Sequence, residues 1–231
     1  MSTFIPARKP GYRSHNAAMG RIARRFPRFS FARGYVRFKL PTDPVYRAVE
    51  RLLQGTDQPL LDIGCGMGLL GLYLCERGGN VVYLGVDRDA RKLRAGRAAS
   101  AHLAGLLNFQ ESDANALPAH RGDVAILDVL HYMPPEHQAN LLNDAAERVS
   151  DEGVLLIRTC IRDDSWRYRL TVIEEWLLHA SGWMHASGTR HIPTREQIAA
   201  PLRAAGFDVE LRPLWGRTPF NSWLCVARRA A

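Results

Sequence analysis

The chain has 231 residues, of which 46% are hydrophobic, enough to build a substantial core in one or two domains. Its 13 prolines and 19 glycines exclude a collagen-like or low-complexity chain, and no apolar run approaches the roughly 18 residues of a membrane-spanning helix. We therefore expect a soluble globular protein whose contact with a membrane is at most peripheral.

The net charge of +8 is concentrated at one end of the chain. Residues 1–42 contain ten basic residues and no acidic one, whereas residues 43–231 contain 21 basic against 23 acidic residues. We interpret residues 1–42 as a basic, aromatic N-terminal arm and residues 43–231 as the main domain.

Within the arm, Met19, Ile22, Ala23 and Phe26 recur at helical spacing, and arginines fill the opposite side. The arm could be a lid over an active site, a docking surface for an acidic partner or an anionic membrane, or a nucleic-acid contact. We favour a lid that also binds an acidic partner.

The four cysteines show no C-x-x-C or His-interleaved spacing, so we expect neither a metal site nor a disulfide framework. The first thirty residues contain no apolar stretch that could form the core of a secretory signal. Both observations favour a cytoplasmic protein, although the Arg-rich, acid-free arm also meets part of the description of a transit peptide.

Beyond the arm, Asp43 and Pro44 predict the start of a helix that runs to about Gly55. Short apolar runs then alternate with amphipathic stretches. This alternation is typical of a parallel sheet with helices on both faces. The predicted strands are 60–63, 81–86, 107–110, 124–127 and 154–157, and the predicted helices are 69–77, 89–103 and 135–149.

Residues 159–193 interrupt this alternation with three tryptophans and three histidines, and we expect this insertion to face the substrate. After it, Thr194 and Gln197 form a capping box for a short helix that ends at Gly206. Two further strands, 209–214 and 223–226, predict a closing hairpin.

The segment from Leu60 to Gly68 reads as an apolar strand that runs into glycines at every second position before a helix. Glycines at such a turn let a ligand approach the backbone closely. Gly66 to Gly71 also matches the dinucleotide pattern G-x-G-x-x-G, so the turn alone fits either NAD or an adenosyl ligand.

Three acidic residues at successive strand ends favour a cationic ligand over an anionic dinucleotide. Asp62 can receive an ammonium group, and Asp87 lies at the spacing at which a carboxylate accepts ribose hydroxyls. Asp113 can accept from an adenine amine. S-adenosylmethionine carries an ammonium and no phosphate, so we predict it as the cofactor.

With these features the chain resembles the class I S-adenosylmethionine-dependent methyltransferases, above all their small-molecule group. The resemblance extends from about Pro59 to Arg228 and includes the first motif Asp-Ile-Gly-Cys-Gly-Met-Gly, the strand end at residues 127–132 and Ala205-Gly206-Phe207. It implies an α/β, Rossmann-like fold with a seven-stranded, mostly parallel sheet whose last strand is antiparallel. The cofactor-binding residues that we expect are Asp62, Gly64, Cys65, Gly66, Gly68, Asp87, Arg88, Asp113, Ala114 and Asp128.

A narrower resemblance involves four segments: Lys39-Leu40-x-x-Asp43-Pro44-Val45-Tyr46, residues 128–132, Ser165-Trp166-Arg167 and residues 216–221. These segments are similar to methyltransferases associated with bacterial aryl polyene pigment biosynthesis, a form of secondary metabolism. That resemblance implies a small aromatic or acyl acceptor, carried in some cases on an acyl carrier protein.

If the acceptor is a hydroxyl, His131 has a suitable intrinsic pKa for a catalytic base, although it could instead only bond the backbone beside the cofactor. Trp166, with Arg169 and His131, is our candidate for substrate contact, against the alternative of packing alone. Arg158 and Arg169 could bind a substrate carboxylate or lie on the solvated surface.

Two other classes of function stay open, an NAD-dependent oxidoreductase and a non-catalytic interaction module that retains the fold. Modification of nucleic acid is disfavoured, because the fourth strand ends Leu127-Asp128-Val129-Leu130 and lacks the [Asp/Asn]-Pro-Pro-[Tyr/Phe] sequence of exocyclic-amine methylation.

Overall fold

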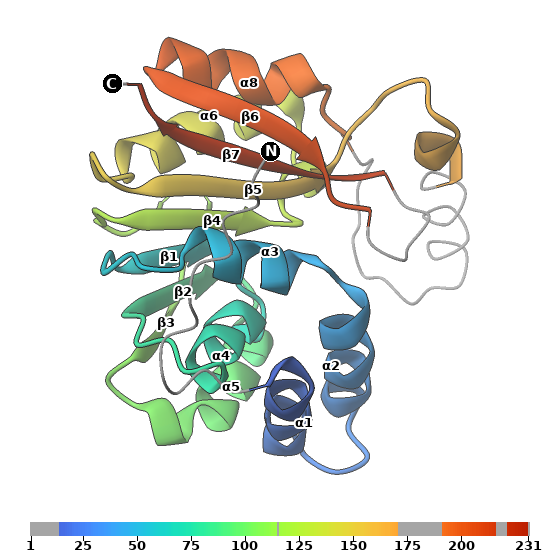
Figure 1. Cartoon of the computed structure of the whole chain (residues 1–231), viewed down its shortest axis with the longest axis vertical. Coiled ribbons are helices and arrows are strands. Elements are labelled where there is room, and N and C mark those ends of the chain that lie inside the picture. Colours follow the sequence, from blue (N-terminus) through green and yellow to red (C-terminus); the bar gives the residue numbers. More distant parts are fainter. Residues whose placement is uncertain (1–13, 115, 171–190, 216–220, 231) are drawn as a thin grey trace, which may run out of the picture.

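A computed structural model describes residues 14–114, 116–170, 191–215 and 221–230. Seven strands form one sheet in the order β3-β2-β1-β4-β5-β7-β6, in which β7 is antiparallel to both of its neighbours (Figure 1). The predicted Rossmann-like sheet with an antiparallel last strand is therefore confirmed. The strands are β1 Leu60–Ile63, β2 Tyr83–Asp87, β3 Leu107–Glu111, β4 Asp123–Leu127, β5 Val154–Cys160, β6 Phe207–Pro213 and β7 Ser222–Arg229.

Helices cover both faces of the sheet, because side chains along each strand alternate between the two. Leu60 belongs to one core with α1, α3 and α4, whereas Leu61 belongs to a second core with α6 and α8. The helices are α1 His15–Arg25, α2 Phe31–Thr42, α3 Val45–Leu52, α4 Leu69–Glu76, α5 Ala90–Ala99, α6 Pro135–Glu147 and α8 Arg195–Ala204, with short 3₁₀ turns η1 Ala101–Leu103 and η2 Leu130–Tyr132.

The predicted elements differ from the observed ones mainly at their ends. The helix expected over 89–103 stops at Ala99, since the backbone turns at Ser100 and continues as the 3₁₀ turn η1. The capping box of α8 is confirmed, with Thr194 and Gln197 bonding each other's backbone N–H. Asp43 accepts the N–H of Val45 as expected, while Pro44 occupies the cap position of α3.

The described part of the basic segment folds against the rest of the chain. Both helices of this segment bury side chains in the core that contains α4: Ile22 in α1, Phe26 just after α1, and Val36 and Leu40 in α2. The Nε atom of Arg21 lies 2.5 Å from Glu76 Oε2 on α4 and ties α1 to the domain. α1 and α2 therefore form a helical hairpin anchored on one face of the sheet (Figure 1), and its role as a lid stays a prediction.

Candidate active site

The glycine-rich turn after β1 has the backbone that its sequence predicts. Gly64, Gly66 and Gly68 all have positive φ, between 56° and 73°, a region that favours glycine. A Cβ at Gly68 would lie 2.3 Å from the ring of Phe109, so a larger residue would also collide there. The turn is fixed by the N–H groups of Gly64 and Cys65, which both donate to the carbonyl of Val86.

Asp87, at the end of β2, holds this turn from the neighbouring strand. One carboxylate oxygen accepts the N–H of Gly66 at 2.8 Å and the other accepts the N–H of Asp89 at 2.8 Å. Each oxygen keeps a further lone pair for a ligand hydroxyl. The space beside Gly66 is open, since the nearest atom to a Cβ built there is Lys92 Cδ at 3.9 Å.

Asp62 lies beneath the turn and is only 3% exposed. Its carboxylate accepts a hydrogen bond of 2.7 Å from the Tyr83 hydroxyl. Burial raises the pKa of Asp62 to about 7, against the opposing effect of that hydrogen bond. Cys65 is half-buried beside this pair, and burial raises the pKa of its thiol well above the usual value. Cys65 is therefore a thiol rather than a thiolate near neutral pH.

The other predicted cofactor residues lie along the same edge. Parallel register pairs Asp87 with Glu111, so Asp113, two residues beyond β3, follows the strand next to Asp87. Asp113 and Arg88 are exposed, and Ala114 is half-buried. The carboxyl ends of β1, β2 and β3 thus bring Asp62, Asp87 and Asp113 to one edge of the sheet.

A cluster of four charged side chains lies at the carboxyl ends of β4 and β5. Asp128 forms ion pairs with Arg158 and with Lys39, whose Nζ lies 3.2 Å from the Asp128 carboxylate. Lys39 also pairs with Asp43 at 2.7 Å, and Arg158 Nη2 lies 3.6 Å from Asp43. Although burial opposes ionisation, the charges of Arg158 and Lys39 lower the pKa of Asp128 below its usual range.

This cluster corrects one expectation and adds residues that the sequence did not suggest. Arg158, weighed as a substrate ligand or a surface arginine, is only 12% exposed and is committed to Asp128 and Asp43. Register could have placed it, because Leu127, the residue before Asp128, pairs with Arg158. Lys39 lies 89 residues before Asp128, and no periodicity or spacing in the sequence links it to this edge.

His131 is buried in the turn η2, three residues after Asp128. Its backbone carbonyl accepts the N–H of His191, and Gln138 donates to the carbonyls of Leu130, Met133 and His191. His131 is therefore held at the same edge as Asp128, and its catalytic role stays a prediction.

The start of the predicted insertion carries an exposed aromatic group. Trp166 is 59% exposed, and the guanidinium of Arg167 lies 4.7 Å from its ring centroid and 4.5 Å from that of Trp215. The sequence predicts Trp166 as a substrate contact, whereas Arg167 enters there only as part of the Ser165-Trp166-Arg167 segment of the narrower resemblance. Arg169 is exposed. Residues 171–190, with Trp176 and Trp183, lie outside the described residues.

The described residues give no sign of two other classes of site. They contain no group of three His, Cys, Asp or Glu side chains placed to hold a metal ion. None of the helices they form is long and apolar enough to cross a membrane.

A sheet of this strand order, with a glycine turn at the end of its first strand, is typical of the class I S-adenosylmethionine-dependent methyltransferases. The chain matches the family described as "Methyltransferase domain" over residues 34–211 and belongs to that family. The chain therefore carries an S-adenosylmethionine-dependent methyltransferase domain, as the resemblance implies.

Three similar proteins illustrate the range of relatives. The ubiquinone biosynthesis O-methyltransferase of Idiomarina loihiensis is 27% identical over 137 residues, which cover 57% of this chain and 53% of that protein, so the match spans about half of its length. Magnesium protoporphyrin IX methyltransferase from Synechocystis PCC 6803, solved with S-adenosylhomocysteine, has a TM-score of 0.66 at 19% identity, covering 94% of this chain and 96% of that one. The pyocyanin biosynthetic protein PhzM has a TM-score of 0.66 at 17% identity, covering 94% and 62%.

Proposed function

We propose that the edge formed by β1, β2 and β3 binds S-adenosylmethionine through the residues predicted above. The Asp87 carboxylate, already oriented by two backbone N–H groups, would accept the ribose hydroxyls with its remaining lone pairs. The open space at Gly66 would accept the ligand against bare backbone. Asp113 would accept from the adenine amine, and the Asp62 region would favour the ammonium group.

We propose that the acceptor is a small aromatic or acyl compound and that a hydroxyl oxygen takes the methyl group. The exposed Trp166 supports an aromatic acceptor, because an acceptor ring can stack on an exposed indole. The name of the Idiomarina relative, an O-methyltransferase of ubiquinone biosynthesis, supports an oxygen.

When bound, S-adenosylmethionine supplies an activated methyl group on a positive sulfur. His131 would take the proton of the acceptor hydroxyl as the oxygen–carbon bond forms and the carbon–sulfur bond breaks. Asp128, kept ionised by Arg158 and Lys39, lies near His131 and would stabilise its protonated form. The protein's main task is to align the two reactants and exclude water.

The carrier-linked acceptor stays a prediction that rests on the basic surface of α1 and α2. An acidic acyl carrier protein would complement that surface. Binding of such a carrier protein to this surface can be measured directly, and it competes with a different occupant of the same surface.

The observation that carries the proposal is the contact between Asp87 and Gly66, and calorimetric titration tests it. We expect Asp87→Ala to weaken S-adenosylmethionine binding at least about 100-fold, because two hydrogen bonds to a charged group are lost. Asp87→Asn should fall between Asp87→Ala and wild type. Asp151→Ala, at an exposed site, is the control. Unchanged affinity in Asp87→Ala, or tighter binding of NAD by the wild type, would refute the assignment.

His131→Gln tests the catalytic step separately from binding. We expect kcat on a panel of aromatic and acyl hydroxyl compounds to fall roughly 100-fold, with S-adenosylmethionine affinity unchanged. The wild-type rate should rise with pH as the base loses its proton, and this rise should vanish in the variant. Binding of cofactor with no methyl transfer to any acceptor would favour the non-catalytic module.

A further inference from the structure

The turn between α1 and α2 holds a phenylalanine in a conformation and an environment that both disfavour it. Residues 27–30 form a tight turn closed by the N–H of Ser30 and the carbonyl of Pro27 at 3.2 Å. Phe29, the third residue of the turn, has φ of 65° and is 94% exposed. Glycine or asparagine normally occupies such a position. A bulky apolar residue kept there against backbone strain points to a function for its ring.

The exposed aromatic surface continues from the turn along α2. Phe31 and Phe38 are 68% and 70% exposed, and Tyr35, on the same face, stacks on Phe31 with ring centroids 6.3 Å apart. Val36 and Leu40, on the opposite face, are buried in the core. The aromatic rings therefore do not serve the packing of α2 against the domain.

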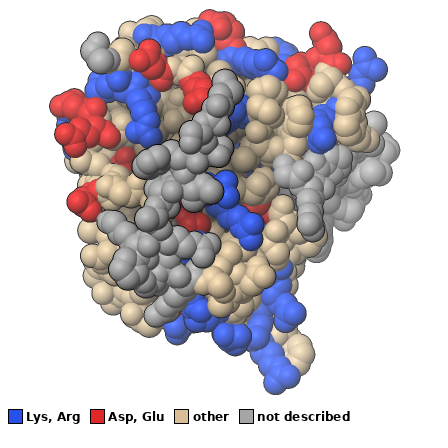
Figure 2. Space-filling view, viewed as in Figure 1, with Lys and Arg blue, Asp and Glu red and all other residues tan. Residues whose placement is uncertain are grey.

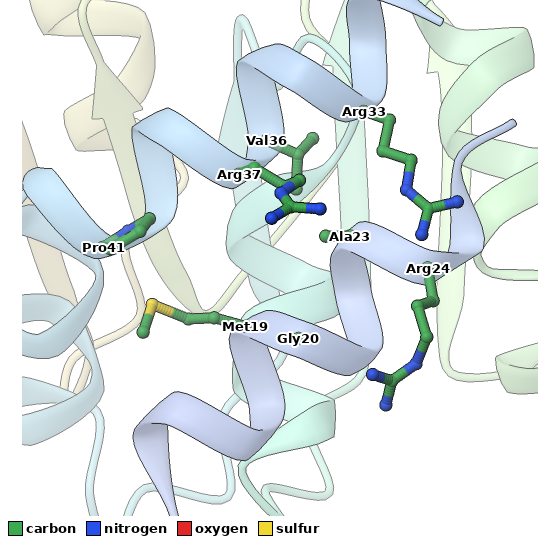
Figure 3. Close-up of a pocket in the computed structure, with 8 residues that line it drawn as sticks. All are labelled: Met19, Gly20, Ala23, Arg24, Arg33, Val36, Arg37 and Pro41. Atoms are coloured by element: carbon green, nitrogen blue, oxygen red, sulfur yellow. The ribbon is translucent and has the colours of Figure 1, made fainter. Parts of the chain in front are cut away.

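Arginines lie at the same turn and in a groove between α1 and α2. A groove of about 350 Å³ runs between α1 and α2, and Figure 3 shows Arg33 and Arg37 reaching from α2 toward α1 above Met19 and Ala23. Arg24 lines the same groove, and Arg28 lies 5.2 Å from the Phe29 ring. These four arginines make no ion pair within the described parts of the chain. Figure 2 shows Lys and Arg side chains gathered at the lower end of the molecule, where the hairpin lies, with no acidic side chain among them on that face.

We propose that the α1–α2 hairpin is a docking surface for an anionic phospholipid membrane. Phe29, with Phe31 and Phe38, enters the boundary between headgroups and acyl chains, and the arginines of the groove and the turn bind lipid phosphates. An acidic protein partner would need only the arginines for binding. Such a partner would not explain why the strained turn exposes Phe29. Basic and aromatic side chains together on a protruding tip fit a lipid surface.

Because the hairpin is anchored to the domain, docking would orient the candidate active site relative to the membrane. The pairing of Arg21 with Glu76 and the buried side chains of α1 and α2 fix the tip relative to the sheet. α2 begins at the tip and carries Lys39 of the charged cluster near its other end. Eight residues of helix separate Phe31 from Lys39, or about 12 Å along the axis. Docking thus brings the candidate active site close to the membrane surface.

Vesicle co-sedimentation of the full chain tests the proposal without cofactor or acceptor, so its result is independent of the proposed function. We expect binding to phosphatidylcholine vesicles containing roughly a third phosphatidylglycerol, and weak binding to pure phosphatidylcholine. Phe29→Gly should weaken binding about tenfold, as a partly buried Phe ring is lost. The triple variant Arg24→Gln, Arg33→Gln, Arg37→Gln should weaken it roughly 100-fold, at about 1 kcal/mol for each charge, and added salt should do the same.

Matched controls separate this surface from general charge and hydrophobicity. The triple variant Arg121→Gln, Arg203→Gln, Arg228→Gln removes the same charge at exposed positions away from the hairpin, and Val82→Ala trims an exposed apolar side chain before β2. Both should bind vesicles like the wild type. Equal loss in the two triple variants, or no preference for anionic vesicles, would overturn the proposal. Binding of an acidic acyl carrier protein that needs the three hairpin arginines but not Phe29, without vesicle binding, would overturn it in favour of the carrier.

Discussion

Asp128→Asn tests the charged cluster that joins α2 to the sheet. Lys39, Asp43, Asp128 and Arg158 together carry no net charge, and the substitution leaves one excess positive charge among mostly buried groups. Asparagine tolerates the left-handed backbone of Asp128, whose φ is 62°, so the change removes charge and adds little strain. Removing one partner of a buried pair costs about 3–5 kcal/mol. Because Asp128 is 28% exposed, we expect the lower end, about 3 kcal/mol.

Urea unfolding measures this loss as a lower midpoint at unchanged slope. Lys39→Met combined with Asp128→Asn restores neutrality, so the double variant should be more stable than the sum of the single effects predicts, by roughly 1–2 kcal/mol. Asp151→Asn breaks an exposed pair with Arg121 and should change stability by less than about 0.5 kcal/mol. A similarly small change in Asp128→Asn would refute the view that this cluster holds the site together.

Three further substitutions test the turn, its buried acid and the hairpin. Folding raises the pKa of Asp62 from 3.8 to about 7. Between these values the unfolded chain loses the Asp62 proton while the folded chain keeps it, so the free energy of unfolding is highest below pH 4 and falls as the pH rises to 7. In urea unfolding, the wild type should therefore lose about 4 kcal/mol more unfolding free energy than Asp62→Asn between pH 4 and pH 7. An equal loss in both proteins would contradict this prediction. Gly68→Ala should cost roughly 2–4 kcal/mol in thermal unfolding, because the new Cβ would meet Phe109 at 2.3 Å and the φ is positive; a smaller loss means that the ring can move aside. Phe29→Gly should stabilise the chain by about 1 kcal/mol through relief of the left-handed backbone, and a lower melting temperature would argue against strain there.

The sheet could be predicted from the sequence because its signals are local. Apolar runs such as Leu60–Ile63 are bounded by turn residues, and each is followed by an amphipathic stretch of helical period. Gly64, Gly66 and Gly68 have positive φ, as a sharp turn from strand to helix requires. The antiparallel position of β7 came from the family resemblance, since periodicity does not fix strand direction.

The residues that the sequence did not connect are joined by ion pairs over long separations. Asp128 and Arg158 meet because β4 and β5 are neighbours in register, which only the sheet order reveals. Lys39 reaches Asp128 because α2 packs across this edge, and that packing depends on buried side chains such as Val36. The sequence does not indicate which oppositely charged residue will lie beside a charged side chain on a helix. A buried cluster of this kind is therefore visible only in the tertiary structure.

The concentration of positive charge in the first 42 residues acquires a meaning once the structure divides it. Arg21 and Arg25 pair with Glu76 and help to hold α1 on the domain, and Lys39 belongs to the charged cluster at the site. These three charges act within the fold, whereas four other arginines have no such role in the described residues. Arg24, Arg33 and Arg37, in the groove, and Arg28, beside the Phe29 ring, make no ion pair in the described structure. Because like charges gathered at one end repel each other, this group destabilises the isolated chain, and binding to an anionic surface outside the protein would relieve that cost.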